Sequence, residues 1–260
     1  MNRALKLLRD IEADALDSNA DLARTLRRVI ALGGEANSGH LREWATRELK
    51  GYDRESDIPP YRQVAAPLVV DGVSGNFHVT GRAISPFSLP KVAHGKVTEE
   101  LALGQPLSVL THALGGKGES IRLQPPRGSD LVLLMNAEQT DPYTYIEPLY
   151  HEVSKATVAM VIDAIRTTLV ELVSEIRAGL GPDFDGEVSS EIAEQALNIA
   201  VSGDANRISF GAIGIARERG HARVTSRGRG QSGQRWAWAA GIGTLLVGVA
   251  AVAVVVTDLI

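Results

Sequence analysis

The sequence contains no cysteine, so disulfide bonds, thiolate metal sites and cysteine nucleophiles are all excluded. This absence also fits a protein of a reducing compartment. Hydrophobic residues make up 44% of the 260 residues and charged residues 22%. A chain of this composition and length folds around one large core or two smaller ones, rather than remaining disordered.

Sequence motifs of the common catalytic sites are also missing. The six histidines show no H-E-x-x-H or other metal-ligand spacing, and no G-x-S-x-G elbow occurs. The segment Gly115–Gly118 lacks the order of a phosphate-binding loop. Residues 228–233 satisfy G-x-G-x-x-G, but they follow no predicted strand. The sequence therefore predicts no catalytic residue, no metal site and no cofactor, and we expect a protein that is not an enzyme.

Positive charge is concentrated in one short stretch. Residues 1–216 carry 21 Lys and Arg against 29 Asp and Glu, a balance of −8, whereas residues 217–235 carry six arginines against Glu218, a balance of +5. Asp258 is the only other charged residue, and the net charge of the chain is −4. The glycines at 220, 228, 230 and 233 predict that residues 217–235 form a flexible basic tether.

An uncharged run follows the tether directly. Residues 237–256 contain no formal charge over 20 positions, and a helix of this length spans about 30 Å, the thickness of the hydrocarbon core of a bilayer. Trp236 and Trp238 are suited to the headgroup interface, and Arg235 precedes them on the side that the positive-inside rule keeps in the cytoplasm. A buried core helix or buried strands are the alternative.

Small residues recur within this run. Ala237, Gly241, Thr244, Gly248 and Ala251 follow one another at steps of four, three, four and three. Such a stripe lets transmembrane helices approach closely, so it predicts a homo-oligomer in which these residues pack together or line a pore. The alternative is that glycine and alanine are simply common in membrane helices.

The N-terminal part is predicted to be helical, because apolar residues recur every three or four positions from Leu5 to Val29 and again from Leu41 to Leu49. The charges within residues 1–16 exclude a signal peptide. Gly33–Gly34 is expected to end the second helix, and Gly51 the third.

Residues 61–146 are predicted to be rich in strands. We expect a hairpin from residues 61–70 and 76–84, with turn residues at Asp71-Gly72 and Gly75, a buried strand at 131–135, and a short helix near 98–103. Two later helices are predicted, one centred on residues 158–176 and one from Ser190 to about Ala200.

These elements predict an α+β fold with a helical N-terminal part, a strand-rich middle and later helices, followed by a single C-terminal transmembrane helix. The expected organisation is one cytoplasmic domain at 1–216, the tether at 217–235 and the membrane helix at 236–260. Such a protein would lie in the inner membrane as a single-pass protein, with its N-terminal domain in the cytoplasm.

At several of these elements the chain resembles the AbiTii domain of bacterial abortive-infection proteins. The clearest match is the sequence WATRELKGY at residues 44–52, followed by IPPYR at 58–62, which is similar to the pattern W…EL-x-GY…P-x-YR of the family. Residues 161–169 and, less clearly, 201–208 extend the resemblance in the expected order over about residues 1–210.

The resemblance implies a role in defence against phage, with cell arrest or death as the output. An AbiTii-like domain with a transmembrane tail resembles the membrane effector of Hailong-type systems. In these systems a partner nucleotidyltransferase makes an oligonucleotide signal that controls a toxic channel. The partners implied are therefore the lipid bilayer, further copies of this chain, and a nucleotide or oligonucleotide ligand.

Two groups of residues are candidates for binding such a ligand. Tyr61 and Arg62 follow two prolines on what we expect to be an exposed turn, where a stacking ring beside a cation could bind a nucleotide or phosphate. An ion pair of the arginine with a neighbour is the alternative. Arg223, Arg227 and Arg229 of the tether could neutralise the phosphates of an oligonucleotide, or only attract anionic lipid and set the topology.

Three functions compete on this sequence. The first is a membrane effector whose tail helices assemble into an ion channel or pore under the control of a nucleotide or oligonucleotide signal. The second is a membrane-tethered toxin enzyme that acts on nucleic acid or nucleotides. The third is a sensing or scaffold module that recruits a toxic partner. The stripe of small residues and the missing catalytic motifs favour the first.

Overall fold

The computed structural model describes residues 3–53, 58–180, 187–202 and 225–226. Contacts divide the chain into two compact units. The described residues of 1–66, 100–121 and 153–213 form the first, which we call the helical unit. Those of 67–99, 122–152 and 214–260 form the second, which we call the sheet unit. The cytoplasmic domain at 1–216 and the boundaries of the tether and the membrane helix stay predictions.

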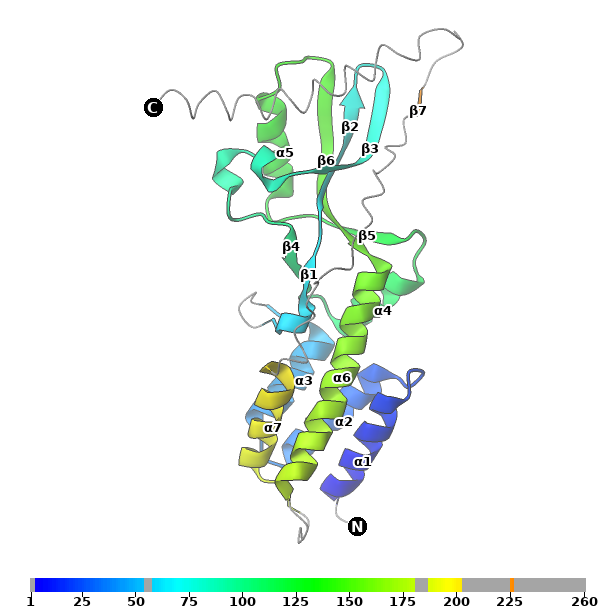
Figure 1. The fold of residues 1–260 in the computed structure, drawn as a ribbon, viewed down its shortest axis with the longest axis vertical. Coiled ribbons are helices and arrows are strands. Elements are labelled where there is room, and N and C mark those ends of the chain that lie inside the picture. Colours follow the sequence, from blue (N-terminus) through cyan, green and yellow to red (C-terminus); the bar gives the residue numbers. More distant parts are fainter. Residues whose placement is uncertain (1–2, 54–57, 181–186, 203–224, 227–260) are drawn as a thin grey trace. The chain divides into compact units, whose positions relative to one another are not determined.

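The helical unit is a bundle of antiparallel helices with a common core (Figure 1). Its helices are α1 (Arg3–Leu16), α2 (Leu22–Glu35), α3 (Gly39–Lys50), α4 (Leu107–Gly115), α6 (Lys155–Leu180) and α7 (Ser190–Ser202). The apolar periodicity of the sequence becomes the buried stripe of each helix: Leu8 and Ile11 of α1 and Ile165 and Leu169 of α6 are fully buried.

Side-chain caps set where two of these helices begin. The Asp21 carboxylate accepts a hydrogen bond from the Ala23 amide at 3.0 Å at the start of α2. The Ser38 hydroxyl accepts one from the Leu41 amide at 3.2 Å at the start of α3. Each cap satisfies an amide of the first turn that has no partner within its helix.

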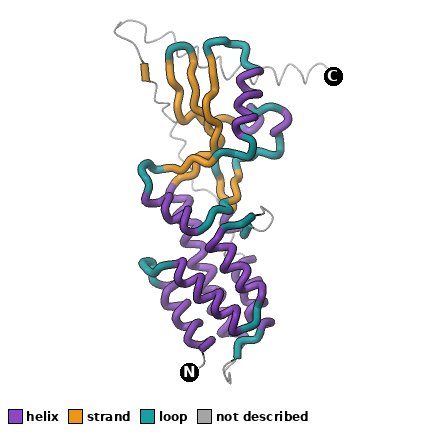
Figure 2. Tube along the Cα trace, turned by 180° about the vertical axis from the view of Figure 1, so that it is seen from behind, coloured by secondary structure: helices purple, strands orange, loops and turns teal. Residues whose placement is uncertain are grey.

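The sheet unit is built on a sheet with the strand order β5-β6-β2-β3-β7. The strands are β2 (Leu68–Ser74), β3 (Phe77–Ile84), β5 (Ser120–Leu123), β6 (Thr144–Ser154) and β7 (Thr225–Ser226), and β2 pairs antiparallel with both β3 and β6. Helix α5 (Gly128–Ala137) and the loop that contains the short helices η3 (Pro86–Ser88) and η4 (Lys91–Ala93) pack on one face (Figure 2).

The α+β character predicted from the sequence is confirmed, and so are the hairpin and the two later helices. Three local predictions are wrong. Residues 131–135 lie in helix α5 rather than in a strand, because a short apolar run fits a buried helix as well as a buried strand. Residues 98–103 contain strand β4 (Glu100–Ala102) rather than a helix, and β4 pairs with β1 (Gln63–Ala65).

The third error concerns Asp71-Gly72, which is not a turn. Strand β2 continues through it to Ser74, and the register shift between Val70 and Gly72 marks a bulge. The hairpin turns at Gly75, whose φ of 59° is in the left-handed region. In the part of the chain described here, no helix is long and apolar enough to cross a membrane, and the predicted membrane helix at 236–260 lies outside it.

Candidate functional site

A buried charged network lies at the C-terminal end of α3. Glu48 is in the last turn of this helix, and Arg62 ends the short helix η2 (Pro60–Arg62); both side chains are fully buried. Nη2 of Arg62 lies 2.6 Å from Oε2 of Glu48, and Nε lies 3.1 Å from the same oxygen. Nε also lies 3.3 Å from Oε1, so two nitrogens of the guanidinium contact the carboxylate in a charge-assisted ion pair.

The remaining donors of Arg62 reach the backbone. Nη1 donates to the carbonyl oxygens of Leu103 at 2.7 Å and Gln105 at 3.0 Å. One guanidinium thus joins η2 both to α3 and to the segment that follows β4. Since a buried cation is costly unless it is paired and hydrogen-bonded, this set of acceptors explains how Arg62 is tolerated in the interior.

Three aromatic residues complete the network around Glu48. The hydroxyls of Tyr52 and Tyr61 donate to Oε1 of Glu48 at 2.6 and 2.8 Å, and Nε1 of Trp44 donates to the Tyr61 hydroxyl at 3.0 Å. The Arg62 guanidinium also lies 5.2 Å from the centre of the Tyr52 ring. Both oxygens of Glu48 therefore have partners, and no face of this carboxylate is open to serve as a general base.

The network perturbs both tyrosines. Burial, followed by the charge of Glu48, raises the pKa of Tyr52 far above its usual value of 10.0. The same two causes raise the pKa of Tyr61. Both hydroxyls consequently remain protonated donors at any physiological pH.

Gly51 makes the position of Tyr52 possible. Its φ is 95°, and a Cβ there would lie 2.8 Å from the carbonyl oxygen of Gly104. This close approach lets the Tyr52 amide donate to that same oxygen at 2.8 Å. A glycine is thus required at position 51 for two reasons: its φ is positive, and there is no room for a Cβ beside the Gly104 carbonyl.

The structure corrects the sequence interpretation of Tyr61 and Arg62. The sequence predicts an exposed turn with a stacking ring and a free cation, whereas both side chains are fully buried. The ion pair, which was the alternative, is the arrangement observed. The sequence analysis did not identify Glu48 as the partner of Arg62. A signal was available, because Trp44 and Glu48 are four residues apart and therefore lie on the same face of the predicted helix.

The other predicted site residues cannot be placed. Three groups lie outside the described residues: the tether arginines 223, 227 and 229, the interface residues 235, 236 and 238, and the stripe at 237, 241, 244, 248 and 251. Their predicted roles as ligand-binding, membrane-interface and packing residues stay predictions.

A second polar cluster, which the sequence did not indicate, lies in the sheet unit. The carboxylate of Asp71 is 10% exposed and accepts hydrogen bonds from the Tyr150 hydroxyl at 2.8 Å and the Gly81 amide at 2.7 Å. Arg122 donates to it at 2.8 Å and lies over the ring of Tyr150, 4.4 Å from its centre. These contacts hold the bulge of β2 between its two neighbouring strands.

Asp71 therefore acts as a structural acceptor at the bulge. Burial and the hydrogen bond to Asp71 raise the pKa of Tyr150, so its hydroxyl stays a donor. Beside the bulge lies a cavity of about 60 Å³, bordered by Arg82 and the strand residues around it. Burial lowers the pKa of Arg82 from its usual value. A space of this size fits one or two water molecules rather than a nucleotide.

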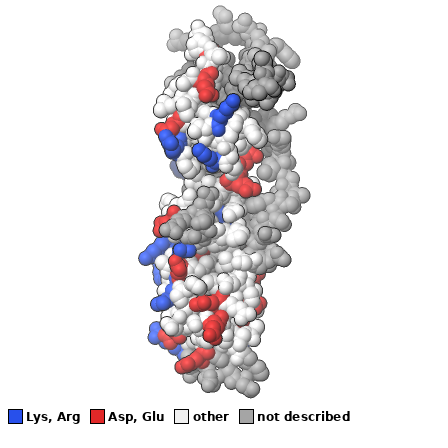
Figure 3. Space-filling model, turned by 90° about the vertical axis from the view of Figure 1, so that its left-hand side faces the viewer, with Lys and Arg blue, Asp and Glu red and all other residues white. Residues whose placement is uncertain are grey.

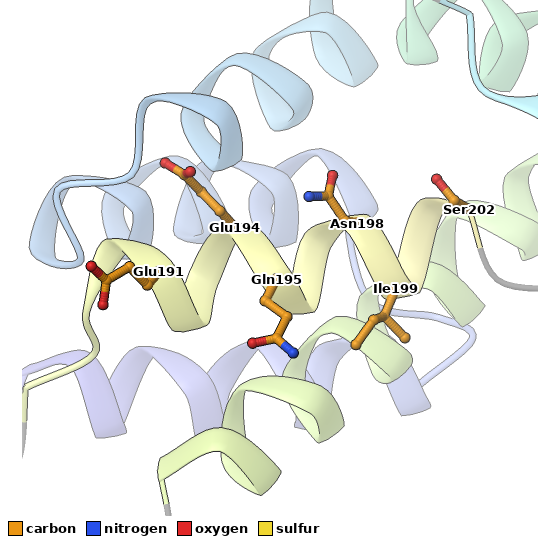
Figure 4. Close-up of a pocket in the computed structure, with 6 residues that line it drawn as sticks. All are labelled: Glu191, Glu194, Gln195, Asn198, Ile199 and Ser202. Atoms are coloured by element: carbon orange, nitrogen blue, oxygen red, sulfur yellow. The ribbon is translucent and has the colours of Figure 1, made fainter.

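An open hollow lies along the outer face of α7 (Figure 4). Its residues are Glu191, Glu194, Gln195, Asn198, Ile199 and Ser202. Figure 4 shows Glu194 and Asn198 on one side of the helix and Gln195 and Ile199 on the other, so their polar groups diverge. This open surface of one helix has no converging groups that would select a ligand.

Metal and phosphate chemistry find little support among the described residues. No three side chains of His, Asp or Glu in that part of the chain come together in a way that could hold a metal ion. Figure 3 shows acidic and basic side chains interspersed on the face that it displays, rather than a basic surface for nucleic acid.

The geometry gives the sequence motif a physical meaning. The polar side chains of W…EL-x-GY…P-x-YR, from Trp44 to Arg62, all belong to one buried network that joins α3, η2 and the segment at 103–105. Such a set preserves a fold rather than exposing a reactive group. The motif thus identifies a domain type.

Comparison with known families agrees with this. The sequence matches the AbiTii family over residues 6–200, about three quarters of the chain. No curated protein and no solved structure matches the chain. The match includes both polar networks and ends within α7, before the basic tether. The protein therefore belongs to the AbiTii family of abortive-infection proteins.

Proposed function

We propose that this AbiTii protein is a membrane-anchored effector of anti-phage abortive infection, which assembles into an ion channel or pore in the inner membrane. One observation carries the proposal: a 20-residue uncharged run follows directly on a basic stretch and a tryptophan pair, C-terminal to the family domain. A helix of that length spans the hydrocarbon core, and the arginines favour retention of the AbiTii domain on the cytoplasmic side.

On this proposal, cell death results from assembly of the C-terminal helices of several copies into a pore. The stripe from Ala237 to Ala251 allows close packing between copies, which supports a homo-oligomer. Thr244 is the only strongly polar residue in the run, so a pore lined by these helices is closed while its apolar constriction is dry and conducts once it is wet. No proton transfer or metal chemistry is needed for this mode of toxicity.

We also propose that a nucleotide or oligonucleotide signal, made by a partner nucleotidyltransferase, controls the assembly. With Tyr61 and Arg62 buried in the helical unit, the basic tether is the remaining candidate of the two for binding this anion. Arginines 223, 227 and 229 offer planar forks that match phosphate. Their position just before the membrane run would couple phosphate binding to the packing of the helices.

The test is expression of the full chain and of a variant that lacks residues 236–260, with membrane potential followed by a voltage-sensitive dye. Full-length protein should depolarise the cells and sediment with membranes, and the truncated protein should do neither. Circular dichroism of the truncated protein checks that its AbiTii domain is folded. Toxicity that survives the truncation would contradict pore formation and favour a tethered enzyme.

A charge-conserving variant tests the role of the tether. Replacing arginines 223, 227 and 229 by lysine keeps the positive charge that sets topology but removes the bidentate fork. We expect this variant to insert normally and to lose most of its response to co-expressed nucleotidyltransferase. An unchanged response would contradict phosphate recognition by these residues.

A further inference from the structure

Exposed apolar side chains are concentrated on the sheet unit. Of the nine large hydrophobic residues that are exposed in the described part of the chain, six belong to this unit: Phe87, Val92, Leu133, Leu134, Tyr143 and Tyr145. Exposed apolar side chains mark a surface that meets another molecule or a membrane where they lie on neighbouring segments.

Two of the segments that carry them are neighbours. The loop at 85–97 and helix α5 pack on the same face of the sheet, where Leu89 and Val97 of the loop share a core with Leu131 and Met135 of the helix. Figures 1 and 2 show the loop beside α5. From this layer, Phe87 (83% exposed), Leu133 (66%) and Val92 (59%) project into solvent.

The loop is held in this conformation by its own contacts. Nε2 of His94 lies 2.8 Å from the Leu89 carbonyl oxygen, and the Phe87 ring meets the His94 ring edge-on at 6.1 Å. Leu89, Ala93 and Val97 are buried beneath. The exposure of Phe87 and Val92 is therefore a property of a packed loop.

Two lysines of this loop favour an anionic partner. Residues 85–97 include Lys91 and Lys96, both exposed, and no Asp or Glu. Apolar tips flanked by lysines fit an anionic lipid surface, where the side chains enter the boundary between headgroups and acyl chains and the lysines meet the phosphates.

The length of the chain keeps this surface near the bilayer. Strand β7 pairs with β3, with Ser226 opposite Phe77, and only ten positions separate Ser226 from Trp236. Ten residues reach at most about 35 Å even when fully extended. If residues 237–256 cross the membrane, the sheet unit is tethered within that distance of the lipid headgroups.

We propose that the sheet unit docks on the anionic surface of the membrane through Phe87 and Val92, with Leu133 of α5 as a further lipid contact. This inference rests on the proposed membrane anchor. It gives the sheet unit a second attachment, which holds the AbiTii domain against the bilayer rather than free on its tether.

Because the sequence has no cysteine, single cysteines can be labelled without background. The test uses full-length Phe87→Cys and Leu133→Cys, each labelled with an environment-sensitive fluorophore and reconstituted into phosphatidylglycerol-containing vesicles. Ser174→Cys, on the exposed face of α6 in the helical unit, is the matched control. We expect lipids brominated in their acyl chains to quench the label at 87 and 133 and to leave the label at 174 unchanged.

The charge contribution has its own variant. Lys91→Glu with Lys96→Glu, introduced into Phe87→Cys, should reverse most of the quenching while the protein stays in the vesicles. Persistent quenching in this variant would contradict the role of the lysines.

The same labels distinguish failure of the docking from failure of the membrane anchor. A label at 87 that remains aqueous in protein that is inserted in vesicles would overturn the docking and leave the membrane anchor intact. A blue-shifted label that brominated lipid does not quench would overturn it in favour of a contact with a second copy. Protein that fails to insert at all would contradict the proposed function itself, and the docking with it.

Discussion

At the scale of single residues, Glu48 and Arg62 depend on each other for burial. The carboxylate receives both arginine nitrogens and two tyrosine hydroxyls, and the guanidinium uses the carbonyl oxygens at 103 and 105 as well. Loss of either partner leaves a desolvated charge whose hydration cannot be recovered. The network is therefore a point of high sensitivity in the helical unit.

This dependence predicts a strong non-additive effect. Arg62→Met should lower the free energy of unfolding by about 3–5 kcal/mol, because it leaves the Glu48 carboxylate buried without its counter-charge. The double variant Glu48→Gln with Arg62→Met should be more stable than Arg62→Met alone, since the neutral amide can still accept from Tyr52 and Tyr61. Urea denaturation of the wild type, of Glu48→Gln, of Arg62→Met and of the double variant measures this; additive losses would contradict the pairing.

Tyr52 predicts how stability depends on alkaline pH. Its pKa is raised in the folded state, so the unfolded phenol loses its proton first, from about pH 10 upward, while the folded one keeps it. The stabilisation is therefore complete below about pH 10 and is lost as the pH rises further, at up to about 1.4 kcal/mol per pH unit.

The matching experiment follows urea unfolding between about pH 8 and about pH 11. Tyr52→Phe removes one titrating group, so its stability should fall less steeply at the alkaline end than that of the wild-type protein. Part of the fall should remain, because the pKa of Tyr61 is raised by the same causes. Parallel profiles for the two proteins would show that Tyr52 does not titrate differently on unfolding.

At the scale of elements, the two adjacent glycines of α2 differ in whether the packing of the helix requires them. The sequence predicts that the helix ends at Gly33–Gly34, and α2 ends one residue later, at Glu35. A Cβ at Gly33 would lie 2.7 Å from Cγ of Arg42 and 3.1 Å from the Arg42 backbone nitrogen, whereas nothing lies within 4 Å of one at Gly34. Only Gly33 is thus required by the close approach of α2 and α3.

These positions form a matched pair of variants. Gly34→Ala should stabilise the protein by up to about 1 kcal/mol, because alanine loses less conformational entropy than glycine in a helix. Gly33→Ala should destabilise it, since α3 would have to move away from α2. Thermal unfolding of the two variants distinguishes them; equal shifts would indicate that the helices approach less closely than described.

Elements also explain where sequence patterns failed. Helix α5 is apolar on both its buried and its exposed side: Leu131, Val132 and Met135 are buried, and Leu133 and Leu134 are exposed. Residues 131–135 therefore show no alternation of apolar and polar positions from which a helical period could be recognised. The position of α5 is set by contacts with the sheet. The Asn136 side chain both donates to and accepts from the Ile146 backbone at 2.7 Å, as a neighbouring strand would.

At the scale of the whole molecule, the AbiTii domain comprises two units with separate cores, and the proposed toxic output lies in the tail that follows it. On this proposal the arginines of the tether bind the controlling signal, and the membrane helix that follows them causes the damage. The two roles can be separated by changes confined to the tail.

Substitutions at Gly248 and Gly243 are such changes. Gly248→Leu places a bulky side chain on the predicted stripe, and Gly243→Leu places the same side chain on the opposite face of the helix. We expect Gly248→Leu to abolish oligomers and depolarisation and Gly243→Leu to retain both. Chemical crosslinking in membranes and the voltage-sensitive dye measure the two effects; equal behaviour of the variants would contradict packing along the stripe.

The sequence by itself determined the hairpin, the family and the helices of the bundle other than α4, because apolar period and turn residues act over a few neighbouring positions. It could not show that Arg62 is buried, that Asp71 forms a bulge, or that the chain divides into two cores. Those outcomes depend on partners far apart in sequence, such as Arg62 with the Leu103 carbonyl and Asp71 with Tyr150, 79 residues away. Only tertiary packing brings such groups together, and desolvation then decides which charge is paired and which residue can bind a ligand.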